Sequence, residues 1–213
     1  MDIFTVENFL NNNDIDLIKS LQEEKESFHD TEGIYKGAVT STQQWIEPAS
    51  DFAKHIQNKL DTIEYLKNNT IDGIQILRAK MPYDVHSDWI VANNQVPIVD
   101  PKIHPPTYTV VIPAIAGEYN TIVFDQKATF NSFNEYKKNN TILENYCSDN
   151  DWQKYCSHCD ASDQKYLTIK KVFTWKQGTL FAFNRKLFHC SSNFGTSSKK
   201  AIVVWLSDLS KIK

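Results

Sequence analysis

The sequence predicts a mainly β protein in which a few helices support a double-sheet jelly roll. Two stretches with helical spacing of apolar residues lie in the first 70 residues. Short β-branched and aromatic segments then fill residues 71–206, apart from a polar excursion at 127–165. Helices followed by a run of short strands are typical of sheets covered by helices. At 213 residues the chain suits one domain, with 1–70 as helical support and 71–206 as a jelly-roll core carrying the 127–165 insertion.

Composition and charge narrow the class of protein. The chain contains 41% apolar and 23% charged residues, as an ordinary water-soluble protein does. Its net charge of -3 gives no electrostatic footprint for nucleic acid. No apolar run has transmembrane length, and the first residues lack a basic start followed by a hydrophobic segment. We therefore expect a cytoplasmic protein with no nucleic-acid or membrane partner. These features do not encode the oligomeric state.

Two helices are predicted in the first third of the chain. The first follows Asn13, a residue type suited to an N-cap, and ends by Glu26. Its apolar stripe consists of Ile15, Leu17, Ile18 and Leu21. The second covers about 48–66, because Pro48 suits a helix start and apolar residues recur at helical spacing after it. Residues 4–9 predict a short strand or docking segment.

Strand signals dominate from residue 71 onward. β-branched and aromatic residues predict strands at 74–79, 107–112, 121–124, 167–173, 179–183 and 201–206. The polar excursion is expected to be partly helical around 133–146. It and a Pro-rich loop at 89–106 would shape any substrate site. Loops of this kind vary too freely to name the substrate.

The stretch Met81–Trp89 carries a His-x-Asp pair between apolar residues. On a strand, His86 and Asp88 would project to the same face, because successive side chains alternate. Among the six histidines, His189 is the third candidate, because it follows a turn and strand at 175–183 and precedes the closing strand. Two imidazoles and one carboxylate form the facial ligand set with which non-haem Fe(II) oxygenases leave coordination positions open.

With a basic residue ten positions after His189, this pattern resembles the Fe(II)- and 2-oxoglutarate-dependent oxygenase family, near its prolyl-hydroxylase-like and phytanoyl-CoA-hydroxylase-like members. The match covers residues 71–206. The resemblance implies a double-stranded β-helix, a cupin-like jelly roll, with Fe(II) held by His86, Asp88 and His189 at its open end. It also implies 2-oxoglutarate and O2 as cosubstrates. The 2-oxoglutarate would be decarboxylated to succinate and CO2 while a small-molecule or peptide substrate is hydroxylated.

The distal carboxylate of 2-oxoglutarate then needs a cation inside the barrel. The resemblance places Lys199 there, because the family's basic residue lies six positions before the aromatic residue that Trp205 matches. Lys200 is the alternative, and strand alternation lets only one of the two point inward.

The chain departs from the family pattern beside this lysine. Many relatives carry an arginine there and a hydroxyl residue two positions later, where this chain has Ala201. A hydroxyl from another strand would compensate. Tyr83, Thr109 and Tyr108 are candidates by placement, and each also suits an ordinary role in the core or sheet.

Simpler interpretations of the same residues stand beside this one. His86 and Asp88 also suit a hydrogen-bonded loop pair, His189 a core histidine, and Lys199 a solvated strand start. At the level of function, the alternatives are a cupin-like module that binds a metal or small ligand without turnover, and an inactive jelly roll with a structural or interaction role. Halogenation is disfavoured, because halide-binding relatives replace the carboxylate that Asp88 supplies.

The four cysteines do not resemble a disulfide framework. Cys147, Cys156, His158 and Cys159 offer zinc-type ligands that include one C-x-x-C pair. Buried thiols without a metal are the alternative, since there is only one such pair and Cys147 is at an unusual spacing. His158 also lies directly between two of the cysteines, which makes joint ligation sterically awkward. Cys190 is expected to be a small core residue.

Overall fold

The computed structural model describes residues 1–21, 25–28, 39–89, 92–93, 96–97, 106–128, 133–194 and 198–208. Most of the Pro-rich loop expected at 89–106 lies outside these ranges. Within them, no helix is long and apolar enough to cross a membrane.

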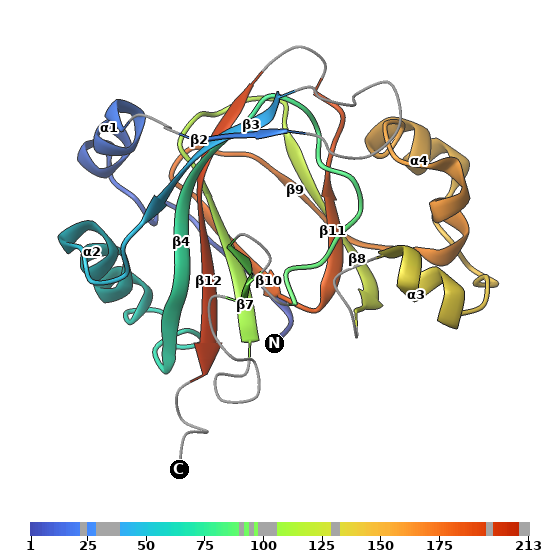
Figure 1. Cartoon of the computed structure of the whole chain (residues 1–213), viewed down its shortest axis with the longest axis horizontal. Coiled ribbons are helices and arrows are strands. Elements are labelled where there is room, and N and C mark those ends of the chain that lie inside the picture. The colour runs from blue at the N-terminus through green and yellow to red at the C-terminus, as the bar shows by residue number, and fades with distance from the viewer. Residues whose placement is uncertain are drawn as a thin grey trace.

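Two antiparallel sheets face each other across an apolar interior (Figure 1). The larger sheet contains, in spatial order, β1 (Ile3–Val6), β10 (Leu180–Asn184), β7 (Pro106–Pro113), β12 (Lys199–Asp208), β4 (Asn69–Ala79), β3 (Val39–Ile46) and β2 (Lys25–Phe28). The smaller sheet contains β11 (Leu187–Ser191), β8 (Asn120–Lys127) and β9 (Ile169–Thr174). A separate pair consists of β5 (Ala92–Asn93) and β6 (Val96–Pro97). Two facing sheets are the predicted jelly-roll architecture.

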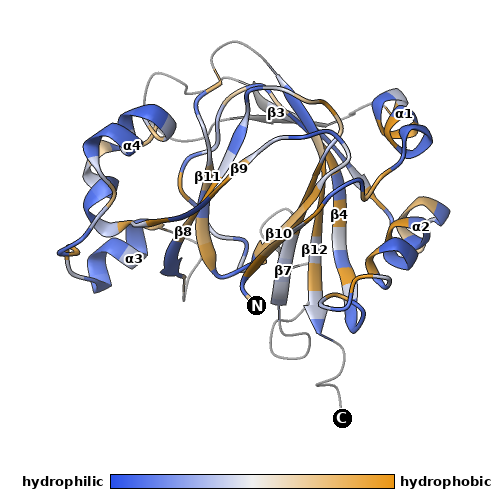
Figure 2. Ribbon diagram, turned by 180° about the vertical axis from the view of Figure 1, so that it is seen from behind, coloured by the Kyte–Doolittle hydropathy of each residue, from blue (hydrophilic) through white to orange (hydrophobic). Residues whose placement is uncertain are grey.

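Helices α1 (Asn12–Ser20) and α2 (Asp51–Leu60) cover the outer face of the larger sheet (Figure 1). Their buried residues, among them Ile18 and Ile56, join one apolar cluster with Ile76 of β4 and Val204 of β12. Figure 2 shows hydrophobic stretches on these strands and largely hydrophilic helices on the outside. The helices therefore stabilise the sheet from behind, as the apolar stripes predict.

The helix starts differ from prediction because the capping side chains lie earlier or later than expected. Asn11, rather than Asn13, caps α1, and its side chain and that of Asp14 each accept a hydrogen bond from the other's backbone N–H. Ser50 caps α2, so this helix begins after Pro48 and is shorter than the predicted 48–66. Helix α1 ends at Ser20, and residues near Glu26 belong to β2.

The polar excursion at 127–165 covers the outer face of the smaller sheet. It forms α3 (Phe133–Asn139), α4 (Asp149–Tyr155) and the 3-10 helix η1 (Ala161–Tyr166). Phe188 and Cys190 of β11 pack against this layer, in a cluster that includes Trp152 of α4. Helices thus flank both sheets from outside (Figure 1).

The first 70 residues contribute more than helical support. They supply β1, β2 and β3 to the larger sheet. A strand or docking segment was expected at 4–9, where β1 overlaps it, but β2 and β3 were not predicted, because sheet pairing of these polar segments depends on partners elsewhere in the chain. β1 pairs with β10, and β3 pairs with β4. Strand β11 and helix α4 were also not predicted as such.

Gly178 lies in the turn before β10 and is hydrogen-bonded to Leu10, in the segment that leads into α1. Its φ is +72°, its N–H donates to the Pro113 carbonyl, and its carbonyl accepts from Leu10 N. A Cβ would lie 2.9 Å from the Leu10 carbonyl oxygen and 3.1 Å from Ile15 Cδ1.

Gly178→Ala should therefore lower the free energy of unfolding by about 1–2 kcal/mol or more, measured by urea denaturation. Lys176→Ala in the same turn is the control. It removes only an exposed ion pair with Glu7 and should cost less than about 1 kcal/mol. Equal effects of the two substitutions would contradict the backbone explanation.

Candidate metal centre

The His-x-Asp segment is held to β11 by a reciprocal pair of backbone hydrogen bonds, next to a third from Ser191 N to the Tyr83 carbonyl. His86 N donates to the His189 carbonyl at 3.0 Å, and His189 N donates to the His86 carbonyl at 2.8 Å. Residues 80–89 are otherwise irregular, so the expectation that His86 and Asp88 lie on a strand was wrong. Tertiary pairing, rather than strand alternation, brings the two histidines together.

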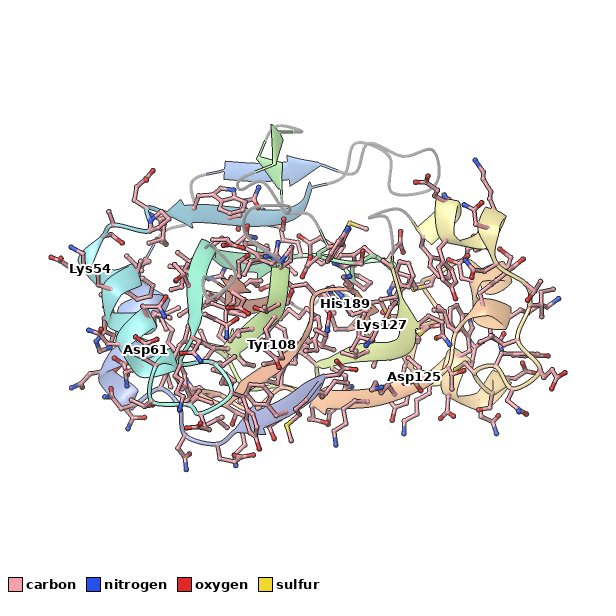
Figure 3. The ribbon with its side chains drawn as sticks, turned by 90° about the horizontal axis from the view of Figure 1, so that it is seen from below. Lys54, Asp61, Tyr108, Asp125, Lys127 and His189 are labelled. Atoms are coloured by element: carbon pink, nitrogen blue, oxygen red, sulfur yellow. The ribbon has the colours of Figure 1, made fainter. Side chains whose placement is uncertain are left out.

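The donor atoms of His86, Asp88 and His189 lie within 4.8 Å of one another. The two imidazole centroids are 4.2 Å apart, and His189 Nε2 is 3.5 Å from Asp88 Oδ2. The side chains of His189 and Asp88 are 9% and 15% exposed, so the cluster borders the surface without being solvated. In Figure 3, His189 lies near the centre of the molecule, away from Lys54 and Asp61, which mark the α2 end.

Both imidazoles are oriented through Nδ1. That of His86 lies 2.7 Å from the Asp84 carbonyl oxygen, and that of His189 lies 3.2 Å from the Leu187 carbonyl oxygen. A carbonyl oxygen can only accept, so each Nδ1 carries the proton. In the neutral form of such a ring, Nε2 carries the lone pair that coordinates a metal.

The protonation states of the cluster suit a cation. Burial, followed by the proximity of His86, lowers the pKa of His189 to about 4, so this ring is neutral near pH 7. Burial opposes ionisation of Asp88, but the two histidines, the Thr109 hydroxyl and Arg185 outweigh it and hold the pKa of that carboxyl below its usual value. The arrangement presents two imidazole nitrogens and one carboxylate.

Arg185 holds the backbone of Asp88 in place, and the sequence analysis did not identify this residue. Its Nε donates to the Asp88 carbonyl at 2.9 Å, while its own carbonyl accepts from Asp88 N at 3.2 Å. Its Nη1 donates to Asp72 Oδ2 at 2.7 Å, and the residue is only 1% exposed. In sequence, Asn184-Arg185-Lys186 between two apolar strands suggests a solvated hairpin turn, so no local signal could identify this buried ion pair.

The three candidate hydroxyls occupy different places. Thr109 Oγ1 donates to Asp88 Oδ2 at 2.7 Å and so supports the carboxylate. The ring of Tyr83 lies 5.8 Å from that of His86, between centroids, so this residue borders the cluster. The hydroxyl of Tyr108 donates to the Met1 carbonyl, and its ring packs on Phe4. The structure thus directs Tyr108 away from the cluster.

Strand alternation along β12 separates the two lysines. Lys200 Nζ donates to the Leu21 carbonyl at 2.8 Å and to the Lys19 carbonyl at 3.3 Å, so it satisfies the C-terminal end of α1. Lys199 points into the barrel and donates to Ser191 Oγ at 2.8 Å. Ser191 lies two residues after His189 on β11, and the two side chains share one face of that strand.

Lys199 is buried without a carboxylate partner among the described residues. Its Nζ lies 4.5 Å from the centroid of the Trp175 ring and 5.0 Å from that of Phe194. Burial lowers the pKa of this ammonium to about 7. A buried cation held by one hydroxyl and two aromatic rings is suited to bind an anion that enters the barrel.

The structure brings together some, but not all, of the four residues predicted as zinc ligands. His158 and Cys159 lie together, and Cys156 contacts Cys190, which was expected to be an ordinary core residue. Cys147 is buried elsewhere in the same apolar cluster, with its Sγ 3.7 Å from the Ser148 carbonyl oxygen.

No protein-family model matches the chain, and no curated protein matches its sequence. Solved structures do match its fold. One is the non-haem α-ketoglutarate-dependent carbocyclase SnoK from nogalamycin biosynthesis, with a TM-score of 0.59 and 12% identity over 97% of this chain and 79% of that chain. Another is HygX from Streptomyces hygroscopicus with nickel and 2-oxoglutarate bound, with a TM-score of 0.56 and 11% identity over 97% of this chain and 82% of that chain.

A third match is an oxidoreductase of the 2OG-Fe(II) oxygenase family from Burkholderia pseudomallei, with a TM-score of 0.51 and 12% identity over 97% of this chain and 84% of that chain. At such identities the likeness concerns the fold. The chain has the double-stranded β-helix fold of Fe(II)- and 2-oxoglutarate-dependent oxygenases, which confirms the predicted fold class.

The Arg185–Asp72 pair generates a second prediction. Arg185→Met should lower the free energy of unfolding by about 3–5 kcal/mol, because it leaves the Asp72 carboxylate buried without its cation. Adding Asp72→Asn should recover a large part of this loss in urea denaturation, since the uncompensated charge is then gone. If the double variant is as unstable as the single one, the ion pair is not what the substitution disrupts.

Proposed function

We propose that this chain is an Fe(II)- and 2-oxoglutarate-dependent dioxygenase that hydroxylates an organic substrate and releases succinate and CO2. The observation that carries the proposal is that donor atoms of His86, Asp88 and His189 lie within 4.8 Å of one another, with both Nδ1 atoms hydrogen-bonded to backbone carbonyls.

The residues present fit Fe(II). Two neutral imidazoles and one carboxylate bind this ion and leave other coordination positions free. Bound iron, together with 2-oxoglutarate and O2, supplies the oxidising chemistry of such a centre. The chain supplies the positioning: Thr109 orients the Asp88 carboxylate, and Arg185 fixes its backbone.

Lys199 is the proposed partner of the distal carboxylate of 2-oxoglutarate. It faces the same interior as His189, is buried, and has a hydroxyl rather than a carboxylate as its partner in the described residues. Lys200 donates its hydrogen bonds to carbonyls at the end of α1 and does not fit this role. Ser191 supplies the hydroxyl that the sequence lacks at Ala201, and the Tyr83 hydroxyl is a second proposed contact.

The substrate is proposed to enter beside His86 and Asp88, where the cluster borders the surface. A small molecule and a peptide side chain are both compatible with this entrance. The apolar lining behind it includes Phe183, whose ring centroid lies 4.6 Å from that of His189.

The proposed centre is tested by anaerobic titration of the metal-free protein with Fe(II) and 2-oxoglutarate. We expect a visible charge-transfer band from iron chelated by the oxoacid, and slow succinate release when air is admitted. His86→Ala should abolish both signals. His55→Ala changes an exposed histidine on α2 and should retain both. Iron binding without succinate would instead favour the binding module, and an absence of iron binding would exclude the proposed function.

The role of Lys199 makes a separate prediction. Lys199→Met should weaken 2-oxoglutarate binding roughly 10- to 150-fold at saturating iron, because a charge-assisted hydrogen bond contributes about 1.5–3 kcal/mol. Lys200→Met should cost stability and leave this affinity within about twofold, since its hydrogen bonds go to α1. Equal losses of affinity in both variants would contradict the assignment.

The affinity should also depend on pH in one direction. The protonated Lys199 binds the anion, and a bound carboxylate raises its pKa above the value of about 7 in the free protein. Binding should therefore be strongest below pH 7 and weaken as the pH rises above it. The Lys199→Met variant should lack this dependence, and a wild-type affinity that rises with pH would count against the role of Lys199.

A further inference from the structure

Three thiols and an imidazole meet behind the candidate iron centre, on the other side of β11. Cys156 follows α4, and Cys159 closes a turn in which its N–H donates to the Cys156 carbonyl at 2.8 Å. Cys190 comes from β11, far along the chain. These three residues are 0%, 8% and 1% exposed, and none forms a disulfide. His158 lies in the same turn.

The spacing of His158, Cys159 and Cys190 suits a metal site, and Cys156 adjoins this group through Cys190. Cys156 Sγ and Cys190 Sγ are 3.8 Å apart. In a tetrahedral zinc site with Zn–S bonds of about 2.3 Å, two sulfur ligands lie ~3.8 Å apart. Cys159 Sγ is 3.3 Å from His158 Nε2, and donor atoms of His158, Cys159 and Cys190 all lie within 4.8 Å of one another.

His158 is not fully satisfied by the protein around it. Its Nε2 lies 3.2 Å from the Tyr83 carbonyl oxygen, while its Nδ1 is buried with no hydrogen-bond partner in the described part of the chain. Buried polar atoms normally have partners, so a buried, unpartnered Nδ1 on an imidazole whose Nε2 contacts a thiol points to a further ligand of this ring. The structure also removes the steric objection to this residue, because its ring and the Cys159 thiol converge.

We propose that Cys156, Cys159 and Cys190, with His158 as the fourth ligand, form a structural zinc site. Three sulfur ligands favour Zn(II) over the oxygen-preferring divalent ions, and four protein ligands leave no open position for catalysis. Each thiol that coordinates releases its proton. Cys147, which the sequence analysis grouped with these ligands, is replaced by Cys190.

Such a site would fasten the α4 layer to the strand that carries the candidate iron ligand. Cys190 follows His189 directly, and their side chains lie on opposite faces of β11. His158 lies against the Tyr83 carbonyl, which also accepts from Ser191 N at 3.1 Å, at the start of the segment that leads to His86. The zinc site does not depend on the proposed oxygenase function, since it uses none of the same side chains.

The test uses the full chain with His86→Ala, so that metal at the iron centre does not contribute. After purification under reducing conditions, we expect one zinc ion per chain by elemental analysis. Replacement by Co(II) should give the near-ultraviolet thiolate-to-cobalt charge-transfer bands, which histidine and carboxylate ligands cannot produce. Chelation of the zinc should lower the thermal midpoint of unfolding, and added zinc should restore it.

Substitutions identify the ligands. Adding Cys159→Ser or Cys190→Ser should reduce zinc affinity by more than the roughly 10- to 100-fold that loss of an outer-shell partner causes. Cys147→Ser is the matched control, another buried cysteine of the same cluster, and should retain the zinc and the cobalt bands. The chelation experiment keeps the test valid if a serine variant fails to fold. A reduced His86→Ala protein without zinc and without the cobalt bands would overturn the proposal.

Discussion

The reciprocal backbone hydrogen bonds between His86 and His189 are the constraint on which the candidate metal centre depends. They join an irregular segment to β11 and set the centroids of the two imidazoles 4.2 Å apart. Each ring is then fixed by its own Nδ1 hydrogen bond to a carbonyl two residues earlier. Local backbone geometry therefore decides both the position and the tautomer of each ligand, before any metal is bound.

Arg185 extends this constraint into the larger sheet. Its guanidinium links Asp72 of β4, the Leu206 carbonyl of β12 and the Asp88 carbonyl. A buried ion pair is seldom a net source of stability when compared with apolar packing, since both charges must be desolvated. The ion pair instead suits a role in conformational specificity. The planar donors of arginine fix the direction from which Asp88 approaches the histidines.

Strand alternation directs neighbouring polar side chains either into the barrel or toward the outer helical layers. On β12, Lys199 faces the barrel and Lys200 faces α1. On β11, His189 faces the barrel and Cys190 faces the α4 layer. Adjacent residues thus serve different layers because each strand is buried on both sides. Both faces of β11 carry metal-type ligands, and this places the proposed zinc site directly behind the proposed iron site.

The sequence by itself determined the residue types of the centre, the two-sheet class and the apolar stripes of α1 and α2, because these depend on local spacing. It narrowed the proposed partner of the 2-oxoglutarate carboxylate to Lys199 and Lys200. It could not choose between these two lysines, since a shift of one residue reverses the faces of a strand. Only the tertiary structure decided that Lys199 points inward, that Arg185 holds Asp88, and that Cys190 joins Cys156. The contacts of Arg185 and Cys190 join residues far apart along the chain, and no local pattern encodes which partner a buried side chain will meet.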